Sequence, residues 1–104
     1  MEYTIDEKFI ETSEAIITQL GFKDIKTFIK NQALMMILAK LDKYESENRF
    51  FEKKYLMSFE EFQKKIKGHE KIENFEEEDD YLDWRFAREA LESLGKKKQD
   101  MKYA

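Results

Sequence analysis

The 104-residue sequence contains no cysteine, no proline, one histidine and only three glycines. Without cysteine the chain has neither disulfides nor thiolate metal sites, and a lone histidine offers little for metal binding or nucleophilic catalysis. The sequence has no apolar run long enough to cross a bilayer and no charged-then-apolar leader. These absences predict a cytoplasmic protein that is not an enzyme and has no cofactor, metal or membrane contact.

Charge is abundant and unevenly distributed. Charged residues make up 40% of the chain and hydrophobic residues 41%, with a formal net charge of −4. Residues 70–95 hold ten acidic and three basic residues, a net charge of −7, whereas residues 96–104 hold four lysines and one aspartate. The run "EEEDD" lacks the alternation and glycine turn of a calcium loop, so it is interpreted as a solvated charge run. This balance favours an elongated or oligomeric helical protein.

The first residues, "MEYTID", alternate in polarity. Tyr3 and Ile5 fall on one side, while Glu2, Thr4 and Asp6 fall on the other, which is the period of a half-buried strand. Because the rest of the chain offers no convincing second strand, this strand is expected to pair with a second copy of the chain.

Helical spacing follows. One amphipathic helix is expected to end at Gly21, and Asp24 is expected to cap a second helix that enters "ALMMILA" at residues 33–39. Seven consecutive apolar residues face every side of a helix, so a second subunit is the expected cover. The residues expected at the dimer interface are Tyr3, Ile5, Leu34, Met35, Met36, Ile37 and Leu38.

The strand, the helix closed by "LGF" and the capped helix beginning "KDIKTFIKNQAL" resemble the ribbon-helix-helix family, which includes antitoxins of toxin–antitoxin pairs. The resemblance covers roughly residues 2–45. It implies a mainly α fold with a short N-terminal strand, a ribbon-helix-helix-like dimer and an extended helical C-terminal arm. It also implies DNA contact through the residues Glu2, Thr4, Asp6, Lys23, Lys26 and Thr27. Two carboxylates on the DNA-facing strand depart from the family pattern, because they would meet phosphate, so a dimer used only for assembly is the alternative.

A helix restart is predicted in "KYLMSFEEFQ". Ser58 and Glu61 form a capping box, and Met57 and Phe62 a hydrophobic staple. The predicted organisation is a dimerisation module at 1–45, a helical connector at 46–67 and an acidic linker at 68–80. An acidic amphipathic helix at 81–95, capped by Asp79 or Asp80 and ended by Gly95, then precedes a basic tail at 96–104.

The segment "FEEEDDYLDWRFAREALESLG" resembles the acidic, aromatic C-terminal segments with which antitoxins wrap a basic toxin. Partner binding is assigned to Tyr81, Leu82, Trp84, Phe86 and Leu91, since acid steers the helix to a basic groove and apolar side chains anchor it. The alternative is an intramolecular cluster in which Trp84 and Phe86 fold back onto the aromatic residues Phe50, Phe51 and Phe62.

The predicted function is that of an antitoxin-like regulator that neutralises a cognate toxin through its C-terminal arm. The predicted partners are the toxin, a second copy of the chain as a homodimer or higher oligomer, and operator DNA for autoregulation. The alternatives are a ribbon-helix-helix transcriptional repressor and an assembly-only dimeric helical protein.

Overall fold

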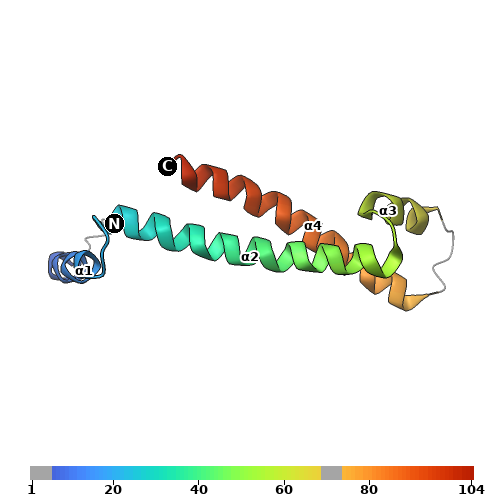
Figure 1. Cartoon of the computed structure of the whole chain (residues 1–104), viewed down its shortest axis with the longest axis horizontal. Coiled ribbons are helices and arrows are strands. Elements are labelled where there is room, and N and C mark those ends of the chain that lie inside the picture. The colour runs from blue at the N-terminus through green and yellow to red at the C-terminus, as the bar shows by residue number, and fades with distance from the viewer. Residues whose placement is uncertain (1–5, 69–73) are drawn as a thin grey trace, which may run out of the picture.

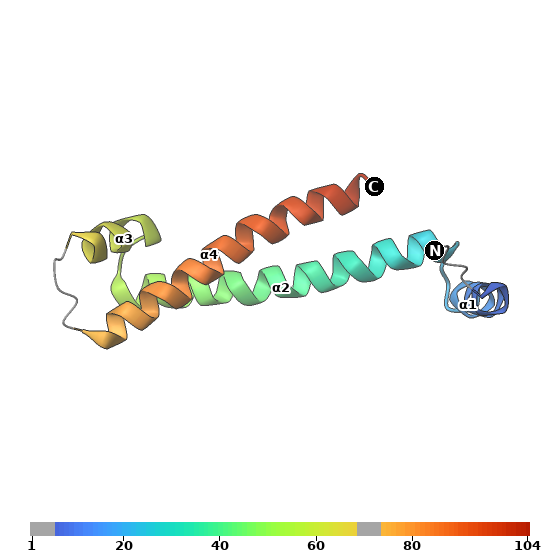
Figure 2. The same cartoon turned by 180° about the vertical axis from the view of Figure 1, so that it is seen from behind.

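The computed structural model describes residues 6–68 and 74–104, and over these residues it contains four helices (Figure 1). They are α1 (Glu7–Gln19), α2 (Ile25–Tyr55), α3 (Phe59–Lys67) and α4 (Phe75–Lys102). α4 runs back along α2 as an antiparallel hairpin, α3 covers the closed end, and α1 lies at the far end of α2 (Figures 1 and 2). The molecule is elongated, with principal extents of 62 × 34 × 23 Å.

The hydrophobic core lies at the closed end, where α2, α3 and α4 meet. Trp84 of α4 and Phe62 of α3 are completely buried there. Tyr55 and Met57 pack against this cluster from the end of α2 and the following turn. The buried residues of the cluster are Phe51, Phe59, Phe62, Ile66, Tyr81 and Trp84.

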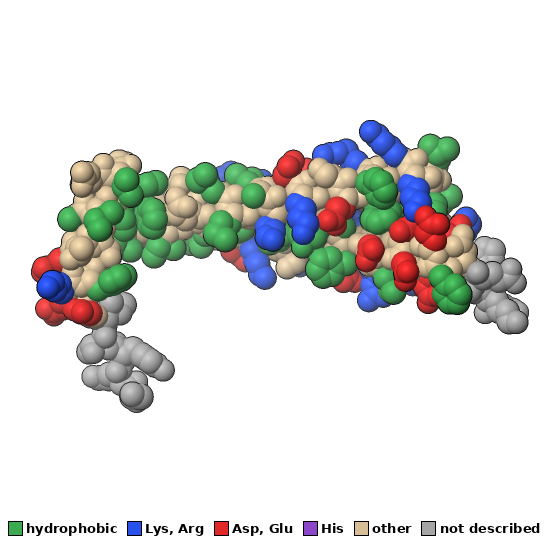
Figure 3. Space-filling view, turned by 90° about the horizontal axis from the view of Figure 1, so that it is seen from below, with side chains coloured by type: hydrophobic (Ala, Val, Ile, Leu, Met, Phe, Trp, Pro, Cys, Tyr) green, Lys and Arg blue, Asp and Glu red, His purple; other side chains and the backbone are tan. Residues whose placement is uncertain are grey.

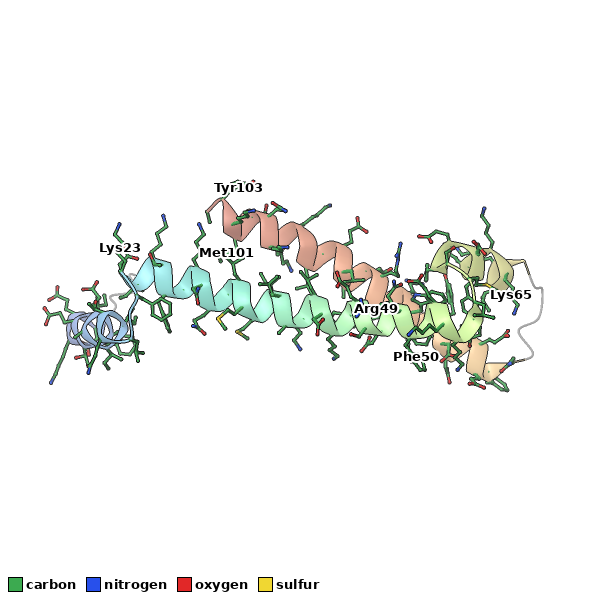
Figure 4. The ribbon with its side chains drawn as sticks, viewed as in Figure 1. Lys23, Arg49, Phe50, Lys65, Met101 and Tyr103 are labelled. Atoms are coloured by element: carbon green, nitrogen blue, oxygen red, sulfur yellow. The ribbon has the colours of Figure 1, made fainter. Side chains whose placement is uncertain are left out.

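A heptad pattern continues from this core toward the open end. On α2, the half-buried residues Leu34, Ile37, Leu41 and Tyr44 precede Asn48 and Phe51 at alternating intervals of three and four. This spacing keeps one face of α2 toward α4, as in a two-helix seam. The two helices separate toward the open end (Figures 1 and 2), where Met101 points from α4 toward α2 (Figure 4).

Two helix starts are confirmed. The Asp24 carboxylate accepts the Thr27 amide N–H at 2.7 Å, and the Ser58 hydroxyl accepts the Glu61 amide N–H at 3.2 Å. Each side chain thereby satisfies a backbone donor that has no partner within its own helix. Between α2 and α3, Leu56 takes the left-handed conformation with φ of 54° and turns the chain into the new helix without glycine or proline.

The predicted strand is wrong for the described residues, which contain helices and no strand. Residues 1–5, including Glu2, Tyr3, Thr4 and Ile5, lie outside the described part. Asp6 caps α1, and its carboxylate accepts the Lys8 amide N–H at 3.0 Å. Alternation produces a strand only where a second strand supplies hydrogen bonds. The ribbon-helix-helix-like fold is therefore corrected to a mainly α helical hairpin.

The C-terminal half also differs from its prediction. The arm is not extended, because α4 folds back on α2. α4 is capped by Asn74, whose side chain accepts two amide N–H groups, rather than by Asp79 or Asp80. It also continues through Gly95 into the segment predicted to be a basic tail. α2 likewise runs unbroken through the expected module boundary at residue 45.

Candidate functional site

The aromatic core fixes which face of α4 is left exposed. Trp84 stacks on Phe51 with ring centroids 5.6 Å apart and meets Phe59 edge-on at 5.5 Å. The Trp84 indole N–H donates to the Asn48 side-chain oxygen at 2.8 Å, so this buried donor is satisfied. Because the indole is held on both its apolar and its polar sides, α4 cannot rotate about its axis without breaking these contacts.

A polar cluster secures the first turns of α4. The Lys54 ammonium group lies 2.6 Å from both Glu76 and Asp80, and the Tyr55 hydroxyl donates to Asp80. Burial, together with the hydrogen bond to Asp80, raises the pKa of Tyr55 to about 12. Burial tends to raise the pKa of Asp80 too, but hydrogen bonds from Lys54 and Tyr55 outweigh it and hold that pKa below its usual value. Hydrogen bonds to Asp80 and Glu76 raise the pKa of Lys54.

The face of α4 that these contacts leave exposed combines apolar and acidic side chains. Leu82 is 52% exposed and Phe86 is 60% exposed, although both lie in the middle of a long helix. Phe75, which is 79% exposed, begins the same line directly after the helix cap Asn74. We call this surface the outer stripe, and it consists of Phe75, Glu78, Asp79, Leu82, Asp83 and Phe86.

The acidic members of the outer stripe have no basic partner among the described residues. Within residues 6–68 and 74–104, none of its three carboxylates takes part in an ion pair. By contrast, Arg88 pairs with Glu60 at 2.7 Å and Arg85 with Glu89 at 3.1 Å, so the two arginines of α4 are already partnered. The net negative charge of α4 is therefore presented mainly on the side that also exposes apolar groups.

A depression of about 550 Å³ adjoins the outer stripe between α2 and α4. Its lining includes Tyr44 and Phe50 from α2 and Asp83 and Phe86 from α4. The rings of Tyr44 and Phe86 meet edge-on with centroids 5.8 Å apart, so Phe86 is supported on one side and open on the other. Phe50 remains largely exposed near the closed end of the hairpin (Figure 4). The arrangement suits an apolar side chain of a partner, with a carboxylate beside it for a basic group.

The residues predicted to bind a partner fall into two sets. Leu82 and Phe86 lie on the outer stripe, whereas Tyr81 and Trp84 are buried in the chain's own core and Leu91 is half-buried. Trp84 thus takes the place that the intramolecular alternative gave it. Phe75 was missed by the sequence reasoning, although its spacing of seven residues from Leu82 is a helical signal.

Four of the six residues of the predicted DNA-binding set lie within the described residues. Glu2 and Thr4 lie outside them, and Asp6 is engaged as a helix cap. The second half of the set, Lys23, Lys26 and Thr27, is exposed around the start of α2. DNA binding stays a prediction from the sequence.

The residues predicted at the dimer interface differ in how exposed they are. Leu34 and Ile37 share the α2 face that continues toward α4, and both are half-buried. Met35, Met36 and Leu38 are each at least half exposed. The remaining two, Tyr3 and Ile5, lie outside the described residues.

The described part of the chain holds no cluster of side chains suited to a metal ion. In the same residues, no helix combines the length and apolar character needed to cross a membrane. No protein-family model, curated protein or solved structure matches the chain.

Proposed function

We propose that this chain is an antitoxin-type regulatory protein that binds and neutralises a basic toxin protein through the outer stripe of α4. The observation that carries the proposal is the combination on one helix face of exposed Phe75, Leu82 and Phe86 with three carboxylates that form no ion pair within residues 6–68 and 74–104. Soluble proteins usually turn such apolar groups inward, and an apolar line with charged borders is typical of a protein-binding surface.

The physical roles of the two kinds of side chain differ. The carboxylates accelerate encounter with a basic surface over a distance set by the ionic strength. The apolar side chains then supply most of the free energy of binding when a partner groove desolvates them. Because the core holds α4 in place, the helix does not have to order on binding, which lowers the entropic cost.

Neutralisation follows by occlusion. A toxin of the ribonuclease type needs a basic surface to hold RNA phosphate, and α4 presents acid to that same surface. The carboxylates of the outer stripe would compete with phosphate for the same basic groups. No residue of the antitoxin needs to react for this competition to work.

The test is co-expression with the protein encoded beside this chain, compared with expression of that neighbour alone. Growth arrest by the neighbour should be relieved by the wild-type chain and by the control Leu56→Ala, which changes an exposed leucine outside the outer stripe. The double variant Leu82→Ala, Phe86→Ala should fail to relieve the arrest. Full protection by the double variant, or a harmless neighbour that does not bind the chain, would contradict the proposal.

Surface substitutions are preferable to deletion of residues 70–104. That deletion also removes Tyr81 and Trp84, which belong to the core with α2 and α3. Loss of neutralisation in the deleted chain would then report unfolding as readily as a missing binding surface.

A further inference from the structure

The open end of the molecule carries an apolar surface that the described residues of the chain leave uncovered. Seven large hydrophobic side chains of α1, its C-cap and the first half of α2 are each at least half exposed. Hydrophobic side chains gather over α1 and the adjoining part of α2, where a few acidic ones lie at the tip of α1, whereas acidic side chains are more numerous toward the other end (Figure 3). The seven residues are Phe9, Ile16, Leu20, Ile29, Met35, Met36 and Leu38.

Part of this surface forms a regular line along α2. Asn31, Met35, Leu38 and Asp42 are separated by four, three and four residues, so they share one helix face, and all four are exposed. This face is distinct from the one that continues toward α4, which carries Leu34, Ile37, Leu41 and Tyr44. We call the four exposed residues the α2 stripe.

The α2 stripe is self-complementary when read in opposite directions. If two copies of α2 pair antiparallel about a two-fold axis between residues 36 and 37, Met35 of one copy faces Leu38 of the other. The same register places the Asn31 amide of one copy opposite the Asp42 carboxylate of the other. Apolar groups therefore meet apolar groups, and a donor meets an acceptor, at every position of the stripe.

The parallel alternative is electrostatically unfavourable. In a parallel pair each residue faces its own copy, so Asp42 would face Asp42 of the other chain across the interface. Two like charges in a partly desolvated interface repel each other. The sequence of the stripe therefore favours a second copy of this chain as the partner, and favours the antiparallel over the parallel orientation.

We propose that the α2 stripe is the docking surface for a second copy of this chain, in antiparallel orientation, with Met35 on Leu38 at the centre and Asn31 beside Asp42 at each side. The proposal is independent of the toxin-binding function, because the outer stripe lies on another helix near the other end of the molecule.

The mass in solution tests the docking surface. The wild-type chain should behave as a dimer, with twice the chain mass of 12.7 kDa, by light scattering after size exclusion at micromolar concentrations. Leu38→Asp should raise the dissociation constant at least a hundredfold and give the single-chain mass. Leu82→Asp is the matched control, because Leu82 is 52% and Leu38 50% exposed, and it should leave the dimer intact. A monomeric wild-type chain, or a Leu38→Asp variant that stays dimeric, would overturn the proposal.

Cysteine cross-linking tests the register and serves also if Leu38→Asp does not fold. The chain has no cysteine of its own, so an introduced cysteine has no background. An equal mixture of Met35→Cys and Leu38→Cys chains should oxidise mainly to the mixed disulfide, since this pair meets in the antiparallel register. If each variant instead cross-links with itself as readily as with the other, or if neither cross-links, the proposed pairing is wrong.

Discussion

Trp84 is the residue on which the docking of α4 depends most, since it is fully buried and contacts both α2 and α3. Trp84→Ala should lower the free energy of unfolding by about 3–5 kcal/mol, because it leaves a cavity and removes the donor to the Asn48 side-chain oxygen. Phe86→Ala, at an exposed position, should cost no more than about 1 kcal/mol. Urea unfolding followed by circular dichroism measures both. Equal stability of the two variants would mean that α4 is not held by this core.

The Tyr55 hydroxyl makes the free energy of unfolding depend on pH in the alkaline range. Its pKa rises from 10.0 to about 12 in the folded chain, so the folded state retains the proton more strongly than the unfolded state. The stabilisation is therefore complete below pH 10 and is lost as the pH rises toward 12. Lys54, whose pKa is also raised, acts in the same direction.

In Tyr55→Phe the tyrosine part of this dependence should disappear, while the lysine part remains. The free energy of unfolding should be measured for both proteins between about pH 9 and 12. It should fall less steeply with rising pH in the variant than in the wild-type chain. If the free energy of unfolding fell equally steeply with pH in the two proteins, Tyr55 would not form the partly buried hydrogen bond to Asp80.

At the scale of elements, the joint between α2 and α3 carries a strained residue. Leu56 has φ of 54°, a backbone conformation that is unfavourable for leucine, and its side chain is 88% exposed. Burial of the side chain therefore does not offset the unfavourable backbone conformation. Leu56→Gly should raise the free energy of unfolding by up to about 1 kcal/mol, since glycine adopts this conformation freely but loses more entropy on folding. Thermal and urea unfolding measure the change. A loss of 1 kcal/mol or more would show that Leu56 supports the turn in another way.

Local chemistry explains which helix ends could be predicted. Asp24 and Ser58 cap their helices through hydrogen bonds to residues three positions away, so sequence alone identifies them. Gly95 was predicted as a stop, yet α4 continues through it. A glycine destabilises an isolated helix by about 1 kcal/mol relative to alanine. Packing of α4 along α2 offsets this loss, so the helix continues.

The candidate site was predicted only in part, and the reason is geometric. Helical spacing placed Leu82 and Phe86 on one line and Trp84 on an adjoining one. Periodicity cannot decide which of two adjoining apolar lines faces the core, since that depends on where α2 and α3 lie. Both Trp84 and Phe86 were therefore predicted to bind a partner, whereas Trp84 is buried in the core and Phe86 is 60% exposed.

At the scale of the whole molecule, stability is expected to be uneven along the long axis. The buried residues concentrate at the closed end, whereas the last turns of α4 are mainly exposed. Amide hydrogens of residues 84–91 should exchange with solvent at least tenfold more slowly than those of residues 98–102. Native-state hydrogen exchange measures both segments in one experiment. Uniform protection along α4 would contradict the asymmetry.

The unbroken length of α2 also sets the spacing of everything attached to it. Its 31 residues form a rod of roughly 46 Å at 1.5 Å per residue. Asn48, which holds Trp84, lies about 11 residues from the proposed two-fold axis, so the two Asn48 residues of a paired assembly would lie roughly 35 Å apart along the paired helices, with each outer stripe near its own Asn48. The assembly is then bivalent with a fixed spacing, and a target that carries two matching grooves at that separation gains avidity that a single copy cannot provide.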